Sequence, residues 1–230
     1  GCSLSLMIIQ IYAFTVIAEA VWAAELGVDH IGFVAGRYDL VPGELSFTEA
    51  RALRDALPSK TTAVALTMAT EVAEIMRMVD AVNPDIVHIS TDIEDVPEAA
   101  MEILKNSLPP SVRLMKALSV GGPESISQAK RFAPFCDFFL LDTKVTGMPG
   151  VGATGHVHDW SISCQIVDEF DIPVILAGGL SEDNVQKAIL AVQPWGVDSN
   201  THTNLIGDPV QKDLDRIAAF VRAVRGMEEF

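Results

Sequence analysis

Phe138-Phe139-Leu140-Leu141-Asp142-Thr143-Lys144-Val145-Thr146-Gly147-Met148-Pro149-Gly150-Val151-Gly152-Ala153-Thr154-Gly155-His156-Val157-His158-Asp159-Trp160 is the stretch of sequence that decides the fold. It opens with an apolar run of the kind found in buried strands, and Asp142 comes directly after that run. A glycine-rich loop follows, and Trp160 then leads into an apolar helical pattern. A buried strand with an acid at its carboxyl end is how parallel α/β enzymes present catalytic groups. The pattern predicts a functional carboxylate at Asp142, with a turn or helix-capping role as the alternative.

Working outward from this stretch, apolar strand patterns alternate with helical patterns along the whole chain. The predicted strands are Met7–Ile11, His30–Val34, Thr62–Thr67, Asp85–Ile89, Val112–Leu118, Asp137–Leu141, Pro173–Ala177 and Gly196–Ser199. The first predicted helix begins at a Thr15 cap and stops at Gly27, and a second opens at Ser46 or Thr48 and runs to Leu57. The other predicted helices are Glu71–Val82, Val96–Asn106, Pro123–Phe132, Ile162–Phe170, Glu182–Val192 and Pro209–Val224.

Eight strand–helix units in 230 residues predict an α/β protein of the (β/α)8 TIM-barrel class with a parallel eight-stranded sheet. No linker or change of composition divides the chain, so we expect residues 1–230 to form a single domain. The alternative is an open, doubly wound sheet. Such a sheet usually carries a glycine-rich nucleotide turn after its first strand, and Ile11-Tyr12-Ala13-Phe14 is not one.

Composition narrows the function classes. The net charge of −15 and the pI of about 4.6 argue against a nucleic-acid partner. An anionic ligand would have to be held by local donors, because the overall field repels it. The chain has 3 cysteines without metal-ligand spacing, so we expect no metal site and a reducing, cytoplasmic location.

The apolar stretch Leu4–Ala24 raises the question of a membrane segment. Gln10 and Glu19 interrupt it, and no Lys or Arg precedes it. We therefore interpret it as a strand followed by a helix and expect no membrane association. Exposed Trp22 or Trp195 could mark a homodimer face, but the sequence leaves the oligomeric state open.

In a barrel, catalytic and binding residues lie at the carboxyl ends of the strands. The residues predicted at these ends are Tyr12, Arg37, His88, Ser90, Lys116, Asp142, Gly178, Gly179, Asp198, Ser199, Asn200 and Thr201. Paired glycines let backbone amides approach a ligand, and the loops after the last two strands form the recurrent phosphate site of such barrels. Gly178 and Gly179, with the hydroxyls of Ser199 and Thr201, are therefore predicted to bind phosphate, with a plain turn as the alternative.

Several segments together resemble the phosphoribosylanthranilate isomerase family of tryptophan biosynthesis. They are Gly27-Val28-Asp29-His30-Ile31-Gly32-Phe33-Val34, Leu140-Leu141-Asp142-Thr143-Lys144, Gly152-Ala153-Thr154-Gly155 with His158-Asp159-Trp160, Ala177-Gly178-Gly179-Leu180 and Gly196-Val197-Asp198-Ser199. The resemblance covers nearly the whole chain. One combination is fairly specific for the family: the strand that ends in Asp142, followed at this distance by the glycine loop and Asp159-Trp160. The strand or the loop alone would be a weak indication.

The resemblance implies an Amadori rearrangement, in which an N-linked ribose phosphate becomes a ketose amine without a cofactor. An acid protonates the ring oxygen, and a base takes the proton from the adjacent carbon. Asp142 matches the family's acid. The family's base is a cysteine in a Lys-Ile-Cys-Gly pattern, but this chain reads Gln10-Ile11-Tyr12-Ala13. Tyr12 is a poorer base than a thiol, because its ordinary pKa of about 10 lies further above neutrality.

His88 stands where the family has a glutamine, and alternation places it on the same strand face as Ser90. If that face is the barrel interior, its imidazole could replace the missing base; a hydrogen-bonded interior histidine is the alternative. The family's Ser-Ser-Gly-Val-Glu is replaced by a run beginning Ser199-Asn200-Thr201, which removes a glycine from the phosphate loop. Asn200 and Gly155 join the predicted phosphate-binding residues.

Two cationic side chains have candidate roles. Arg37 could bind the carboxylate of an aromatic acid through its planar guanidinium, or be a solvated loop residue. Lys116 is expected inside the barrel, paired with a carboxylate such as that of Asp142, in either a structural or a catalytic role.

The main hypothesis is an isomerase of this type acting on a small phosphorylated substrate, with Asp142 as acid and Tyr12 or His88 as base. One alternative is a diverged paralogue that acts on another phosphorylated ligand. The other is a binding protein without catalysis.

Overall fold

The computed structural model describes residues 6–143 and 159–228. The strands are β1 (Ile8–Ile11), β2 (His30–Ala35), β3 (Glu44–Leu45), β4 (Thr62–Thr67), β5 (Ile86–Ile89), β6 (Arg113–Val120), β7 (Phe138–Thr143), β8 (Val174–Ala177) and β9 (Gly196–Ser199). The α-helices are α1 (Ile17–Glu25), α2 (Phe47–Ala56), α3 (Val72–Val82), α4 (Glu98–Ser107), α5 (Glu124–Phe132), α6 (Ser161–Glu169), α7 (Val185–Val192) and α8 (Leu214–Arg225). Short 3-10 helices lie at Ala133–Phe135 (η1), Thr201–Thr203 (η3) and Gly226–Glu228 (η4).

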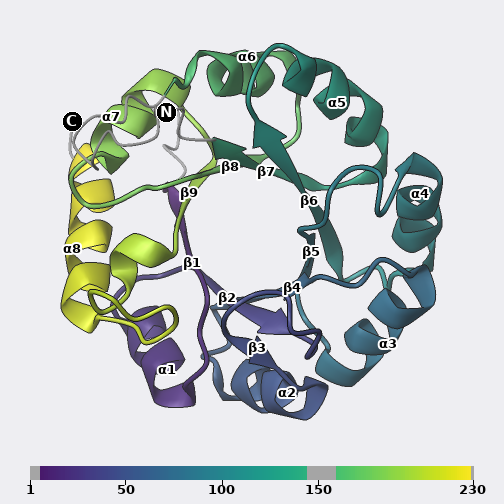
Figure 1. Ribbon diagram of the computed structural model, residues 1–230. Coiled ribbons are helices and arrows are strands. Elements are labelled where there is room, and N and C mark those ends of the chain that lie inside the picture. Colours follow the sequence, from purple (N-terminus) through teal and green to yellow (C-terminus); the bar gives the residue numbers. More distant parts are fainter. Residues whose placement is uncertain (1–5, 144–158, 229–230) are drawn as a thin grey trace.

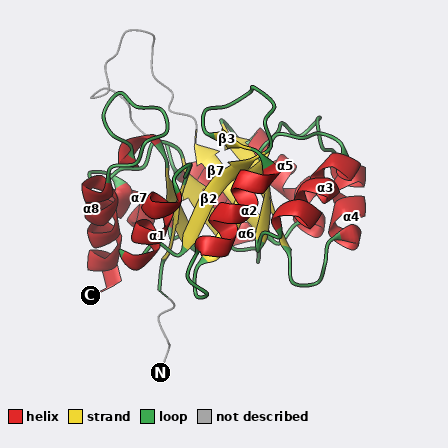
Figure 2. Cartoon of the chain, turned by 90° about the horizontal axis from the view of Figure 1, so that it is seen from below, coloured by secondary structure: helices red, strands yellow, loops and turns green. Residues whose placement is uncertain are grey.

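The sheet closes into a barrel of parallel strands. Its order is β1-β9-β8-β7-β6-β5-β4-β2, and β1 pairs with β2 to complete the ring, with β3 as a short addition beside β2. Figure 1 looks along the barrel and shows α1 to α8 arranged around it; Figure 2 shows the same arrangement from the side. The predicted (β/α)8 barrel is confirmed. No helix in the described part of the chain is long and apolar enough to cross a membrane.

Local hydrogen bonds decide where helices begin. Ser46 caps α2 in a capping box with Glu49, as the sequence predicts for Ser46. The predicted Thr15 cap of α1 is wrong, because the N-cap residue is Val16 and no side chain caps it. The last helix begins at Leu214 rather than at Pro209, because the Asp213 side chain accepts hydrogen bonds from the first turn.

Apolar side chains pack in two layers that are divided by the sheet. Val64, Ile86, Met115 and Ile175 fill the inside of the barrel, and a larger cluster packs between the strands and the helices. Both faces of the strands are therefore buried, which is typical of a parallel sheet covered by helices. This packing leaves the carboxyl end of the barrel as the place for a ligand.

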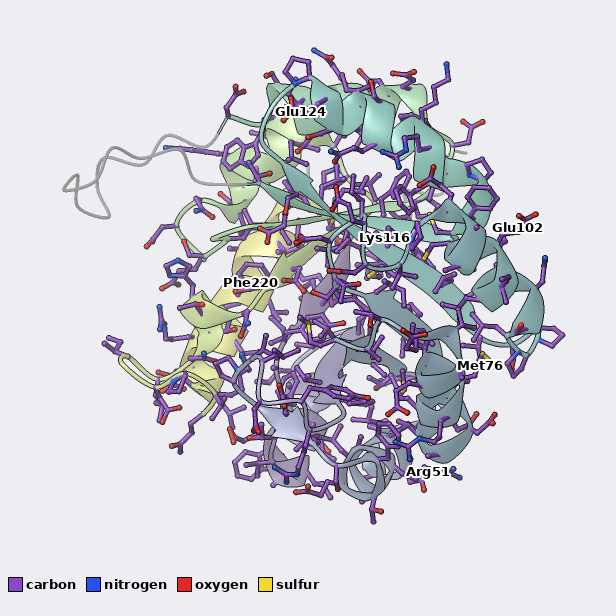
Figure 3. The ribbon with its side chains drawn as sticks, turned by 45° about the vertical axis from the view of Figure 1, so that its right-hand side comes forward. Arg51, Met76, Glu102, Lys116, Glu124 and Phe220 are labelled. Carbon is purple, nitrogen blue, oxygen red and sulfur yellow. The ribbon has the colours of Figure 1, made fainter. Side chains whose placement is uncertain are left out.

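Lys116 lies on the outer face of β6, which corrects the prediction that it points into the barrel. Its neighbour Met115 faces inward, and the Lys116 ammonium lies 5.6 Å from the ring centroid of Phe132 on α5. Lys116 is fully buried, and its Nζ donates to the carbonyl of Thr91 at 2.6 Å. Figure 3 labels Lys116 and, at the start of α5, Glu124. Lys116 therefore fixes the loop after β5 instead of contacting a ligand.

Trp195 packs at the amino end of the barrel, so it does not form an exposed face. Its ring lies 5.7 Å from that of His30 and 5.3 Å from that of Phe138, between centroids, and these are the first residues of β2 and β7. Trp22 on α1 is the exposed tryptophan of the two, with 55% of its surface accessible.

Candidate active site

A cavity of about 1020 Å³ opens at the carboxyl ends of the strands, and we call it the barrel cavity. The residues predicted from sequence that line it are Tyr12, His88, Ser90, Asp142, Gly178, Gly179, Asp198, Ser199, Asn200 and Thr201. Arg37 and Lys116 do not line it. Gly155 lies outside the described residues. The carboxyl ends of β1, β5, β7, β8 and β9 thus bring these residues together, as expected from the rule that functional residues of a barrel lie at the strand ends (the strand-end rule).

Tyr12 and His88 form a hydrogen-bonded pair across the barrel. The Tyr12 hydroxyl lies 2.8 Å from Nδ1 of His88, although the two residues come from β1 and β5. The Tyr12 ring packs against Gly32 on β2, where an added Cβ would lie 2.4 Å from a ring carbon. Gly32 therefore leaves the space in which the tyrosine ring reaches His88.

Both members of this pair are neutral at physiological pH. Burial raises the pKa of Tyr12 well above its usual value, and the nearby charge of Asp198 raises it further. Burial lowers the pKa of His88 to about 3, with a smaller contribution from Lys116. Either neutral tautomer of the imidazole is compatible with this contact, so the phenol either donates to Nδ1 or accepts from it. Nε2 of His88 is buried and has no hydrogen-bond partner within the described residues.

Gly178 brings the loop after β8 against the end of β7. Its φ is +104°, and a Cβ there would lie 2.5 Å from the Thr143 carbonyl oxygen and 3.0 Å from Oδ1 of Asp142. Only glycine fits this contact between the two strand ends. The backbone of the loop after β8 thus lies directly beside the Asp142 carboxylate.

The two loops predicted to bind phosphate are linked by side chains. Ser199 donates its hydroxyl to the Leu180 carbonyl at 3.0 Å, which joins the end of β9 to the loop after β8. Asn184 donates to the Gly179 carbonyl at 3.0 Å and accepts from the Ser181 amide at 2.8 Å. The α7 helix begins at Val185, later than the predicted Glu182, because residues 182–184 form a turn.

Asp198 is a buried carboxylate in the wall of the barrel cavity, and the sequence analysis assigned it no role. Its Oδ2 accepts a hydrogen bond from Nε2 of Gln10 at 3.0 Å, and Oε1 of Gln10 lies 3.0 Å from Nδ1 of His30. Burial raises the pKa of Asp198 to about 7; Gln10 and Lys212 lower it in part, and Asp142 raises it. Gln10 lies two residues before Tyr12, so both side chains point to the same, inner face of the barrel. This spacing is the sequence signal that could have placed Gln10 near Asp198.

Lys212 is a buried cation that the sequence analysis did not single out. It is buried, and its Nζ donates to the carbonyls of Tyr12 and, at 3.2 Å, Asn200. Burial lowers the pKa of Lys212 to about 7, against the raising effect of Asp198 and Glu19. Lys212 therefore ties the end of β1 to the loop after β9.

Arg37 lies away from the barrel cavity. Its guanidinium forms an exposed ion pair with Glu49 at the start of α2. The same loop is held by Glu44, whose carboxylate accepts four backbone amides, from Tyr38 through Val41. No group of three or more potential metal ligands occurs among residues 6–143 and 159–228.

The buried histidines should make the native protein acid-sensitive. Burial lowers the pKa of His88 to about 3 and that of His30 to about 4, so the unfolded chain binds their protons first. Stability is then lost progressively as pH falls below about 6.5, by ~2 kcal/mol for each histidine at pH 5. Asp198 acts in the opposite direction, because its raised pKa makes the folded state bind a proton first.

His88→Gln isolates one of these contributions. We expect the free energy of unfolding of the native protein minus that of H88Q, measured with urea, to fall by ~2 kcal/mol from pH 7.5 to pH 5, because only the native protein carries His88. Asp198 and His30 contribute equally to both proteins and cancel. An unchanged difference would mean that His88 is protonated in the folded state.

The fold and the cavity can now be compared with known proteins. The family model of N-(5'-phosphoribosyl)anthranilate isomerase matches residues 10–223. Named N-(5'-phosphoribosyl)anthranilate isomerases from Methanosarcina mazei and Pseudomonas syringae pv. tomato are 32% and 36% identical to the chain. The first alignment covers 90% of both chains, and the second covers 94% of this chain and 97% of its relative.

Solved structures agree with the sequence relatives. A phosphoribosyl anthranilate isomerase from Thermotoga maritima superimposes with a TM-score of 0.79 at 25% identity, covering 96% of this chain and 100% of that one. Another structure, of monomers generated from the dimeric Thermotoga enzyme, has a TM-score of 0.78 at 25% identity, with the same coverage. Together with the barrel and its cavity, these matches show that the chain belongs to the phosphoribosylanthranilate isomerase family of enzymes.

Proposed function

We propose that this protein catalyses the Amadori rearrangement of phosphoribosylanthranilate, an N-linked ribose 5-phosphate, to the corresponding ketose amine. The observation that carries the proposal is the position of Asp142. It lies at the end of β7, in the wall of the barrel cavity and directly beside the glycine loop after β8. Family membership supplies the reaction class, and Asp142 supplies the cavity with a carboxyl group that can act as the acid.

Asp142 is proposed as the general acid. Its carboxyl proton goes to the ring oxygen, the bond between C1 and that oxygen breaks, and the nitrogen lone pair forms the C1=N bond. The cationic imine then withdraws electrons from C2 and makes its proton removable. The chain needs no cofactor for this step, because the substrate itself is the electron sink.

The phosphate is proposed to bind where the loops after β8 and β9 meet. Gly178, Gly179, Ser199, Asn200 and Thr201 line this part of the cavity. Glycine backbone and small polar residues supply local donors, which an anion requires in a chain of net charge −15. Gly155 remains a proposed contributor from outside the described residues.

Tyr12 and His88 are proposed to act as a neutral donor pair, rather than as the base. A phenol with a raised pKa and an imidazole with a pKa of about 3 are both poor proton acceptors at pH 7. In the tautomer in which the Tyr12 phenol donates to Nδ1, the buried Nε2–H of His88 can instead donate to a substrate oxygen and hold it in place.

Tyr12→Phe tests this pair. The variant keeps the ring on Gly32 but removes the hydroxyl from Nδ1 of His88, so the phenol no longer holds the imidazole in the tautomer that donates from Nε2. We expect kcat to fall about tenfold or more with KM changed little. Steady-state kinetics measure the effect, and a native-like kcat would remove the pair from the mechanism.

The function itself is tested by turnover of phosphoribosylanthranilate, followed by its fluorescence change, with native protein and Tyr12→Cys side by side. Native turnover is the expected result. Turnover by Tyr12→Cys alone would mean that the cavity accepts the substrate but that the native chain lacks a competent base. Silence in both would favour the diverged-paralogue alternative and direct the search to other sugar phosphates.

Cytoplasmic location and a homodimer complete the proposal. A biosynthetic enzyme with few cysteines suits a reducing compartment, and the Thermotoga relative is dimeric. Trp22 on α1 is the exposed aromatic residue that a dimer face could bury. Light scattering of native protein and of Trp22→Glu measures the oligomeric state and whether this face is used.

A further inference from the structure

We propose that the carboxylate of Asp198 is the base that takes the proton from C2 of the substrate, and that Gln10 positions it from the barrel interior. The inference rests on the proposed isomerisation. It names the group that performs the proton transfer in a chain without the family's cysteine.

The position of Asp198 meets the first requirement for a base, which is access to the ligand. It lines the same cavity as Asp142, and the two carboxylates come from β9 and β7, on either side of β8. One oxygen, Oδ2, is held by Gln10, while the residue keeps 7% of its surface accessible. An acid and a base therefore face one ligand from two strand ends.

The neighbours of Asp198 hold its carboxylate in a single orientation. Gln10 pairs in register with Asp198 on one side and with His30 on the other. The Gln10 amide is bonded at both ends, with its nitrogen at Asp198 and its oxygen at His30 Nδ1, so its direction is determined. All three side chains are more than nine-tenths buried, so the contact excludes water and the carboxylate is preorganised.

The electrostatics agree with this role. The titratable groups that act on Asp198 are Asp142 from β7 and Lys212 from the loop before α8, and Asp198 in turn raises the pKa of Tyr12 on β1. The pKa of Asp198 is about 7, which balances proton affinity against the fraction ionised at neutral pH.

The proton transfers balance in this arrangement. After ring opening, the Asp198 carboxylate forms an O–H bond with the C2 proton. The C2–H electron pair becomes the C1=C2 bond, and the C1=N electron pair returns to nitrogen. Asp198 then gives its proton to C1, and the C2 hydroxyl proton returns to Asp142 as the ketone forms. Both carboxylates recover their initial protonation states, and no oxidant or reductant is needed.

Asp198→Asn is the first test, because the amide has the same shape but cannot accept the proton. We expect kcat to fall about 100-fold or more while KM stays within about threefold, with circular dichroism confirming the fold. A kcat within about threefold of the native value would overturn the inference.

Two substitutions of Gln10 keep the proposal testable if Asp198→Asn does not fold, and they move the pH profile in opposite directions. Native kcat/KM should rise with pH to a plateau above about 7, following ionisation of Asp198. Gln10→Met removes the hydrogen bond that lowers the Asp198 pKa, so this rise should move to higher pH. Gln10→Lys places an ammonium beside the carboxylate, so the rise should move to lower pH.

A merely structural role of Gln10 would change stability or the kcat plateau without these opposite displacements. An identical pH profile in all three proteins overturns the inference. Native turnover combined with that outcome leaves the proposed function standing and removes only Asp198. Absence of native turnover overturns the proposed function, and the assignment of Asp198 falls with it.

Discussion

Asp142→Asn is expected to abolish turnover, lowering kcat by about 10³-fold while leaving the fold intact. The amide has nearly the same shape but cannot give a proton to the ring oxygen, and ring opening would depend on water. The side chain lies at an exposed strand end, so the substitution leaves the core packing unchanged.

Steady-state kinetics at the native pH optimum measure this effect, and thermal unfolding checks the fold. Glu124→Gln is the matched control, because Glu124 is another carboxylate in the cavity wall, at the start of α5 (Figure 3). We expect the control to keep kcat within about twofold of native. Turnover by Asp142→Asn above a tenth of the native rate would falsify the acid assignment.

Gly178→Ala is expected to have the largest effect on stability and also to weaken phosphate binding. An added Cβ would lie 2.5 Å from the Thr143 carbonyl oxygen, and neither that backbone atom nor the φ of +104° can adjust cheaply. Strain and overpacking together predict a loss of ~3 kcal/mol or more. The shifted loop should also raise KM about tenfold, because the amides no longer meet the phosphate.

Gly207→Ala is the control that separates the cost of the steric clash from the cost of the positive φ. Gly207 has a φ of +81°, but an added Cβ there meets nothing within 4 Å. This variant should lose only ~1 kcal/mol, with native kinetics. Urea unfolding of both variants and inhibition by inorganic phosphate are the measurements. Equal losses in the two variants would show that the contact between the loop after β8 and β7 is unimportant.

Cavity residues whose placement follows from the local sequence pattern could be identified from sequence. Asp142 follows an apolar strand, and Gly178 and Gly179 follow another, so the strand-end rule placed all three at the cavity. The same rule placed Tyr12 and His88 there. Their local signal is strong because strand and helix patterns are short-range, and because every parallel strand of a barrel ends on the same side.

Which face of a strand points inward was less predictable. Both faces of these strands are apolar, one against the barrel interior and one against the helices, so alternation alone cannot distinguish them. Lys116 was assigned to the wrong face for this reason. Arg37 was expected near the ligand because of its loop position, but an ion pair with Glu49 holds it elsewhere.

The sequence by itself determined the barrel, the family and the location of the candidate site, because these depend on periodic apolar patterns and on motifs within short stretches. Tertiary structure alone decided how the side chains of the barrel cavity are paired. The Tyr12–His88 contact joins residues 76 positions apart, and the Gln10–Asp198 contact joins residues 188 apart. The pKa values of these groups arise from burial and from neighbours that meet only when the barrel closes.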